Sequence, residues 1–268
     1  MPRITFVYPR KTEALSITNR SCALNCAHCR GHYLKHMKSI SSQVTKISKG
    51  IKSYLISGGC DLEGAVPLKN HLDALKKLSL GYRLIAHTGL IKKEDVPLVS
   101  PYIYAASFNF IGDDSTIKEV YNLNKTTLDF IESYNTLKRM VKTFPHITIG
   151  LHHGRVKGEY NAIDILSKLG ASALVFNIFI PTSGTELKDA APPHLDTVLD
   201  VMSYAKERMN KTDIYLGCMR PGGYYRGKLD ELCVKMGVDK IVMPSVGARK
   251  YAKGNGYEIL ESQECCVI

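Results

Sequence analysis

Short apolar runs rich in β-branched and aromatic residues recur along the chain, and longer segments with helical spacing of apolar positions separate them. This alternation is typical of βα units on a parallel sheet. Strands are expected at eight runs, 14–18, 53–57, 82–87, 102–107, 146–151, 173–179, 212–217 and 239–243. Helices are expected between them, at 41–50, 66–79, 91–98, 127–143, 159–169, 194–210, 228–236 and 246–253. Eight such units predict an α/β protein with a complete (β/α)8 TIM-type barrel.

The segments that follow these strands are unusually rich in reactive side chains. In a (β/α)8 barrel the loops after the strands converge on one rim, and functional residues gather there. No internal repeat, low-complexity tract or linker divides the chain. We therefore expect one barrel domain over 1–253 and a short tail over 254–268 that closes over the barrel mouth.

The amino-acid composition is that of a folded globular protein and does not by itself identify a binding partner. Hydrophobic residues make up 44% of the 268 positions and charged residues 23%, as in ordinary globular proteins. The net charge of +11 would steer anionic partners, but the basic residues form no nucleic-acid motif with interleaved aromatics. The chain also lacks the roughly 18-residue apolar stretch of a membrane span and the apolar run of a signal peptide. These features predict a cytoplasmic protein with neither a nucleic-acid nor a membrane partner.

Eight cysteines are more than packing in a reducing compartment requires, and their clustering indicates metal or redox chemistry. Cys22, Cys26 and Cys29 have the spacing C-x3-C-x2-C in the loop after the first expected strand. Three thiolates leave one corner of a metal site open, whereas structural zinc and electron-transfer 4Fe-4S sites normally have four protein ligands. A zinc site completed by His28 or His32 is the alternative.

The cysteine triplet, at this place in a barrel, resembles that of the radical S-adenosylmethionine (radical SAM) superfamily. The resemblance implies that Cys22, Cys26 and Cys29 hold a 4Fe-4S cluster whose open iron binds the amino and carboxylate groups of SAM. Such a cluster donates one electron and cleaves SAM to methionine and a 5'-deoxyadenosyl radical. His28 stands where this family usually has an aromatic residue packed near the adenine, a role that a flat imidazole can fill.

Three further segments resemble cofactor-binding parts of the same family. Gly58 and Gly59 resemble the Gly-Gly motif whose backbone receives the methionine amino group, although Cys60 replaces the acidic residue that often follows. A tight turn is the alternative explanation for this glycine pair. Asn177 and Pro181 resemble residues beside SAM in biotin synthase-like enzymes. His153, after the fifth strand, is assigned to the same cofactor; an imidazole that only anchors its loop is the alternative.

The remaining cysteines raise the question of a second cluster. Cys60 and Cys218 each follow an expected strand, and Cys265 and Cys266 lie on a tail long enough to fold back. By resemblance to biotin and lipoyl synthases, these four thiols would hold an auxiliary 4Fe-4S cluster that supplies sulfur. Buried packing and a C-terminal prenylation signal are the alternatives. Cys233 falls on the apolar side of a short helix and is expected in the core.

The segments SGGCDLEGAVPL and GCMRPGG and the terminal ECC resemble a biotin synthase-related group of archaea and anaerobes. Some of its members form one half of a two-protein lipoyl synthase. This implies sulfur insertion into an octanoyl chain on an acidic carrier protein or lipoyl domain, such as the glycine cleavage H protein. A second radical SAM enzyme and a ferredoxin-like electron donor would be further partners.

Other functions stay open at this stage. Another radical SAM enzyme, either biotin synthase-like or modifying methyl groups or carbon skeletons, would share the cysteine triplet. An iron–sulfur electron-transfer protein would bind iron without cleaving SAM. Arg220 is expected to bind a carboxylate of SAM or substrate, because a guanidinium pairs with carboxylates through two parallel hydrogen bonds.

Overall fold

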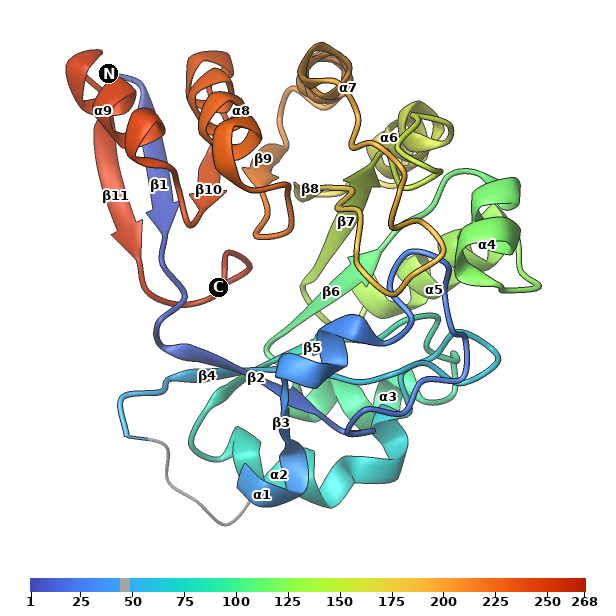
Figure 1. The fold of residues 1–268 in the computed structure, drawn as a ribbon. Coiled ribbons are helices and arrows are strands. Elements are labelled where there is room, and N and C mark those ends of the chain that lie inside the picture. Colours follow the sequence, from blue (N-terminus) through green and yellow to red (C-terminus); the bar gives the residue numbers. More distant parts are fainter. Residues whose placement is uncertain (44–48) are drawn as a thin grey trace.

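The computed structural model describes residues 1–43 and 49–268 and has one curled sheet at its centre (Figure 1). All of its strand pairs are parallel, in the order β11-β1-β10-β9-β8-β7-β6-β5-β4-β2-β3. The strands are β1 Arg3–Val7, β2 Thr12–Ser16, β3 Lys38–Ser39, β4 Ser53–Ser57, β5 Arg83–His87, β6 Ala105–Asn109, β7 Thr143–Ile149, β8 Ala173–Ile178, β9 Asp213–Leu216, β10 Lys240–Val242 and β11 Glu258–Ser262.

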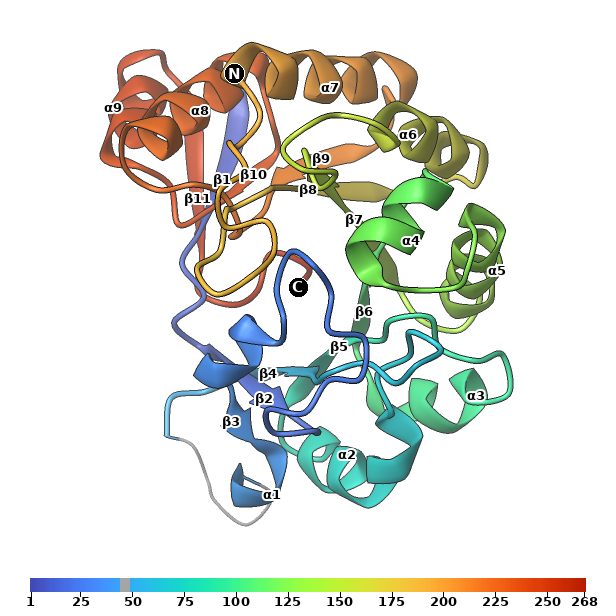
Figure 2. The ribbon, with the colours of Figure 1, turned by 45° about the vertical axis from the view of Figure 1, so that its right-hand side comes forward.

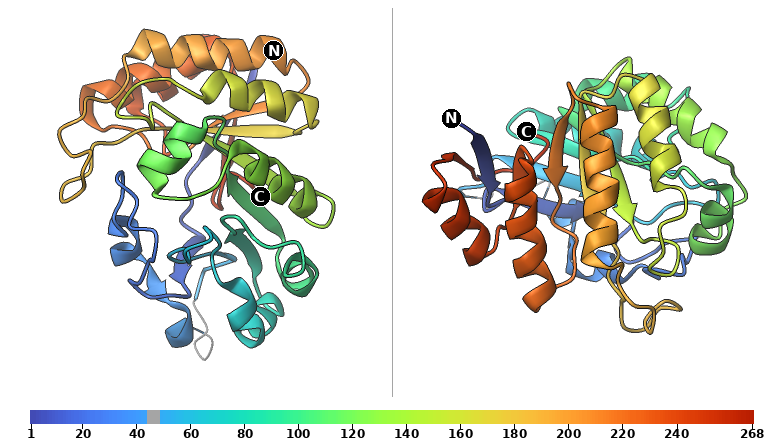
Figure 3. Two further views of the ribbon diagram at one scale, coloured as in Figure 1. Left: turned by 90° about the vertical axis from the view of Figure 1, so that its right-hand side faces the viewer. Right: turned by 90° about the horizontal axis from the view of Figure 1, so that it is seen from above.

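Helices cover the outside of this sheet, and Figure 3 shows α6 to α9 side by side there. The α-helices are α1 Ile40–Gln43, α2 Leu72–Ser79, α3 Val96–Val99, α4 Asp114–Tyr121, α5 Thr127–Lys138, α6 Glu159–Lys168, α7 Leu195–Arg208, α8 Gly223–Met236 and α9 Val246–Gly254. Three 3-10 turns are η1 His32–His36, η2 Leu68–His71 and η3 Ser100–Tyr102. The expected helix at 41–50 begins within α1, and its positions 44–48 lie outside the described residues. Within the described residues, no helix is long and apolar enough to cross a membrane.

The predicted α/β barrel class is confirmed, with one change in how the barrel closes. Each of the eight expected strands is present within a few residues of its predicted position, and β1, β3 and β11 are additional. β3 and β11 are the edges of the sheet and do not pair with each other. The barrel is therefore a curled open sheet, and the chain between β1 and β2 crosses its opening.

Alternation along the strands divides the apolar residues between two cores. Side chains that point outward, such as Phe6 and Leu84, join the large core under the helices. Inward-pointing neighbours, such as Val7 and Ile85, form a smaller core inside the curl. Successive strand residues face opposite sides of a sheet, so both cores follow from one period-two pattern. Cys233 of α8 is fully buried in the outer core, as predicted.

The C-terminal tail lies inside the curl of the sheet (Figures 1 and 2). Cys266 and Val267 are 7% and 1% exposed and belong to the inner core. The backbone N–H of Cys265 donates to Thr12 Oγ1 at 2.8 Å, and Lys240 Nζ donates to the Cys266 carbonyl at 2.8 Å.

Thr12 and Lys240 are the first residues of β2 and β10, and Arg83, which pairs with Glu264 of the tail, is the first residue of β5. The tail therefore fills the end of the barrel where the strands begin. This placement differs from the expected one over the mouth, where the loops after the strands emerge. The physical reason is that the open sheet leaves apolar side chains uncovered at that end, and burying them against the tail is favourable.

Candidate metal and cofactor site

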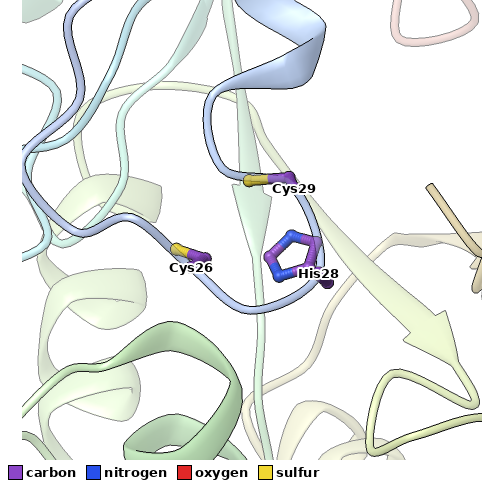
Figure 4. A group of neighbouring side chains, drawn as sticks. All are labelled: Cys26, His28 and Cys29. Carbon is purple, nitrogen blue, oxygen red and sulfur yellow. The ribbon is translucent and has the colours of Figure 1, made fainter. Parts of the chain in front are cut away.

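The cysteine triplet lies on the loop between β2 and η1. Figure 4 shows this loop curled so that Cys26, His28 and Cys29 gather on one side of it. Their ligand atoms all lie within 4.8 Å of one another. Cys22 and Cys60 are near enough that their charges contribute to raising the pKa of the Cys26 thiol. The local chain thus brings together the residue types that bind soft metal ions.

Hydrogen bonding within the loop favours a thiolate at Cys29. The hydrogen bond from Cys26 lowers the pKa of Cys29 to about 4, with further lowering from His28, against the opposing effect of burial. A cysteine must be deprotonated to ligate a metal. The loop therefore provides a ligand in its binding form at neutral pH.

The C-terminal end of α4 supports the cysteine loop. The backbone N–H of Ala27 donates to the Val120 carbonyl at 2.8 Å, and Cys26 Sγ lies 3.6 Å from the Tyr121 carbonyl. The rings of His28 and Tyr121 are 5.1 Å apart and tilted by 47°. His28 Nδ1 is buried without a hydrogen-bond partner, so it is available to a ligand. Sequence analysis missed α4, because the eight residues between two turns carry only a short apolar pattern.

Gly59 makes the closest backbone approach in this part of the site. A Cβ placed on Gly59 would lie 2.0 Å from the Ser21 carbonyl oxygen and 2.5 Å from Cys22 Cα. The Gly59 N–H donates to Thr18 Oγ1 at 2.7 Å, and the Ala23 N–H donates to the Cys60 carbonyl at 2.8 Å. Only glycine fits here, since β4 and the cysteine loop touch backbone to backbone. Gly58 is less crowded, with a Cβ position 3.0 Å from the Ile17 side chain.

The loop after β8, which contains Pro181, reaches the cysteine loop. The Tyr33 hydroxyl and Thr182 Oγ1 are 3.1 Å apart, and the Leu187 N–H lies 3.4 Å from the Ala27 carbonyl. Tyr33 follows the triplet directly in the chain and was also missed from the sequence. These contacts place the region of Pro181 beside the cysteines.

Asn177 and His153 have other neighbours. Asn177 Oδ1 accepts a hydrogen bond from the Met219 N–H at 3.4 Å. A Cβ atom on Gly217 would lie only 2.2 Å from the same oxygen, so Gly217 has no room for a side chain. His153 lies with His152, their rings 5.0 Å apart. Asn177 therefore connects β8 to the loop after β9. His153 contacts His152, its neighbour in the loop after β7.

The four cysteines predicted for an auxiliary cluster divide into two places. Burial raises the pKa of Cys60 to about 12, and the charges of Cys22 and Cys29 add to this, so Cys60 belongs to the first group. Desolvation inside the curl raises the pKa of Cys218, although its surface is still exposed to solvent, and Cys265 is the next contributor. Cys218 thus faces the tail, while Cys60 lies with the triplet. In the described part of the chain, Cys218 and the tail cysteines are not among the groups of three ligand atoms within 4.8 Å.

Arg220 does not face a ligand, in contrast to the prediction. It is 2% exposed, and its Nε and Nη2 donate to the two carboxylate oxygens of Asp230 at 2.7 and 3.0 Å. Nη2 also donates to the Val242 carbonyl at 2.8 Å. A bidentate pair between Arg220 and a carboxylate was expected, but the carboxylate belongs to Asp230 of α8 and not to a ligand. This buried pair shapes the loop after β9 that carries Cys218.

Two histidines point into the barrel between the tail and the loops. The rings of His87 and His146 lie 6.1 Å apart. Burial lowers the pKa of His87 to about 4 and that of His146 to about 3, so both are neutral at physiological pH. Identifying His146 required knowing which face of β7 points inward.

No protein-family profile and no curated protein matches this sequence. Several solved structures match its fold. Methylornithine synthase (PylB) matches with a TM-score of 0.62 and 11% identity over 90% of this chain and 72% of its own. The FeFe-hydrogenase maturase HydG from Carboxydothermus hydrogenoformans gives 0.64 and 15%, over 90% and 58%.

SuiB from Streptococcus suis, solved with S-adenosylmethionine bound, gives a TM-score of 0.54 and 16% identity over 90% of this chain and 58% of its own. The chain thus spans under three fifths of HydG and SuiB. At such low identity, these likenesses establish that the chain shares the barrel fold of PylB, HydG and SuiB.

Proposed function

We propose that the chain is a radical SAM enzyme in which Cys22, Cys26 and Cys29 hold a 4Fe-4S cluster with one iron left for SAM. The observation that carries this proposal is the cysteine loop itself, which gathers Cys26, His28 and Cys29 on one side and favours a thiolate at Cys29. The shared fold with SuiB, a protein that binds S-adenosylmethionine, supports it. When bound, the cluster supplies the electron that cleaves SAM to methionine and a 5'-deoxyadenosyl radical.

The residues around the loop fit such a cofactor. Gly58 and Gly59 let the backbone after β4 lie directly against Cys22, where the methionine end of SAM would lie. The unpartnered Nδ1 of His28 would face the adenine. Pro181 would line the opposite side, because the loop after β8 contacts the cysteine loop, and Asn177, near the end of β8, would lie below it. These groups would orient SAM and exclude water from it.

As the finer assignment, we propose sulfur insertion into a protein-bound octanoyl chain, as in a lipoyl synthase. Cys60, Cys218, Cys265 and Cys266 would be the auxiliary cluster ligands, and Cys60 would then have to leave the first cysteine group. The net charge of +11 suits an acidic octanoylated carrier or lipoyl domain. A second radical SAM enzyme and a ferredoxin-like donor would complete the system.

One observation favours a second candidate. Cys60 lies with the first cysteine group, and the tail cysteines lie at the opposite end of the strands. This separation favours a radical SAM enzyme without an auxiliary cluster, in which the tail cysteines pack the inner core. Iron content distinguishes the two candidates.

The test measures iron, sulfide and SAM cleavage after anaerobic reconstitution. Wild type should cleave SAM under strong reductant, and the Cys22/Cys26/Cys29→Ala variant should lose about four irons and all cleavage. Cys233→Ala, which removes a buried cysteine away from the site, is the matched control. Retained cleavage in the triple variant would refute the proposal, and iron binding without any cleavage in wild type would indicate an electron-transfer protein.

A second variant, Cys218/Cys265/Cys266→Ala, addresses sulfur insertion. If wild type holds about eight irons and this variant about four, an auxiliary cluster exists. If both hold about four, the second candidate replaces the first. Mössbauer spectra would show whether the iron in each sample is in 4Fe-4S form.

A further inference from the structure

A second group of metal-ligating side chains lies outside the cysteine loop. Glu119 of α4 and His152 and His153 of the loop after β7 have ligand atoms within 4.8 Å of one another. His152 Nε2 and Glu119 Oε2 are 3.8 Å apart, too long for a hydrogen bond. The two atoms therefore face each other without a direct bond between them.

The hydrogen bonds of His152 show which ring nitrogen carries the proton. Thr116 Oγ1 donates its only hydrogen to Asp113 Oδ2 at 2.7 Å. The same oxygen lies 3.2 Å from His152 Nδ1, so in that contact it accepts, and Nδ1 is the protonated nitrogen. In the neutral ring, the lone pair is then on Nε2, directed toward Glu119.

A lone pair and a carboxylate oxygen that face each other repel unless a hydrogen-bond donor or a cation lies between them, and two imidazoles beside a carboxylate suit a metal cation in that position. Metal-binding histidines typically donate their other ring N–H to a hydroxyl, carboxylate or carbonyl, as His152 does here. Donor atoms around one ion at about 2.1 Å lie about 3 to 3.5 Å apart, so Glu119 and His152 need to approach by only a few tenths of an ångström. Glu119 is 55% exposed in its side chain and free to move that far.

The loop that carries the two histidines is held rigidly. The Glu159 carboxylate accepts from the N–H groups of Gly150 and Lys157, both at 2.7 Å. A Cβ on Gly154 would lie 1.9 Å from the Ala191 carbonyl oxygen, which shows how closely the loop packs. The backbone that carries the two histidines is thus held in place before any ligand arrives, which favours a metal site.

We propose that Glu119, His152 and His153 form a binding site for a divalent first-row transition metal ion, separate from the cysteine loop. Two imidazoles and one carboxylate are a ligand set that proteins use for zinc and for non-haem iron, with open positions for water or an oxygen donor of a substrate. Val120, the next residue after Glu119, bonds to the cysteine loop. An ion here would link α4 to the β7–α6 loop beside that site. This assignment of His153 replaces its predicted contact with SAM.

The test is zinc binding by the full reconstituted chain, measured as zinc content after desalting and by calorimetry. Glu119→Gln and His152→Ala should each lose one equivalent of zinc relative to wild type. His71→Ala removes an imidazole at the junction of η2 and α2, away from the β7–α6 loop, and should bind zinc as wild type does. Equal zinc content and affinity in all four proteins would overturn the proposal.

Two further measurements exclude a different cause. Zinc X-ray absorption should show nitrogen and oxygen neighbours at about 2.0 to 2.2 Å, and a sulfur shell near 2.3 Å would place the ion on the cysteines and also overturn the proposal. Thr116 is a positioning residue, and Thr116→Val should weaken zinc binding about 10- to 100-fold, whereas Thr116→Ser, which keeps the hydroxyl, should not. Equal affinity in these two variants would refute the role of the Thr116 hydroxyl.

Discussion

Replacing Gly59 with alanine should damage the cysteine site and the fold together. The added Cβ would lie 2.0 Å from the Ser21 carbonyl oxygen, whereas real contacts of this kind stay above 3.0 Å. The backbone at Ser21 and Cys22 must therefore move by at least 3.0 − 2.0 = 1.0 Å. Neither obstacle is a flexible side-chain end, because both Ser21 O and Cys22 Cα belong to the main chain.

The size of the effect follows from this displacement. Forcing one extra methyl into a closely packed position costs about 1 to 3 kcal/mol. For a chain of this size, each kcal/mol lowers the melting temperature by about 2 to 4 °C, so the expected loss is about 2 to 12 °C. A metal site tolerates ligand displacements of only about 0.2 Å, so a shift of 1 Å at Cys22 should also lower iron content after reconstitution.

The assay compares Gly59→Ala with Gly81→Ala by thermal unfolding and iron analysis. Gly81 has no atom within 4 Å of its Cβ position, so its substitution should change stability by less than about 0.5 kcal/mol. Equal melting temperatures and iron contents in the two variants would refute the packing argument. A lower melting temperature with unchanged iron would show that Cys22 is not a ligand whose position depends on Gly59.

The remaining predictions concern the barrel interior. Burial lowers the pKa of His87 to about 4 and that of His146 to about 3. Below pH 6.5 these two histidines are therefore protonated in the unfolded chain but still neutral in the folded chain. Stability should fall by up to about 3 kcal/mol per histidine between pH 6.5 and 4, and urea unfolding of His146→Phe should show a smaller fall; an unchanged pH profile would contradict this. Asp230→Asn leaves the buried Arg220 charge without a counter-ion and should cost about 3 to 5 kcal/mol in the same assay, whereas a loss under 1 kcal/mol would mean that the pair is hydrated. Val267→Asp places a carboxylate at a position 1% exposed and should destabilise the chain by several kcal/mol; wild-type stability would show that the tail does not fill the barrel in solution.

Local patterns in the sequence located most of the fold. Apolar runs placed all eight expected strands near their observed positions, because strands of a parallel sheet are buried on both faces and read as nearly continuous apolar segments. The spacing of the cysteines and the glycine pair also predicted which residues gather at the cysteine loop. This was possible because residues on one short loop are close in space whatever the rest of the fold does. β1 and β11 were not predicted; β11 at the edge of the sheet is only partly buried, and its partner β1 lies more than two hundred residues away in the sequence.

The partners of particular side chains needed the folded chain, whether those partners lie near or far along the sequence. Arg220 was recognised as a residue for pairing with carboxylates, but its choice of Asp230 over a ligand depends on how α8 packs. The lone pair of His152 facing Glu119 likewise depends on the approach of α4 to the β7–α6 loop. The end of the tail shows the same limit, since the six residues 263–268 after β11 carry no period from which their burial could be inferred. Periodicity reveals which face of an element is buried, whereas packing of the whole barrel decides which segment buries it. In this chain that packing placed Cys265 and Cys266 in the inner core at the end where the strands begin, and not at the mouth beside the cysteine loop.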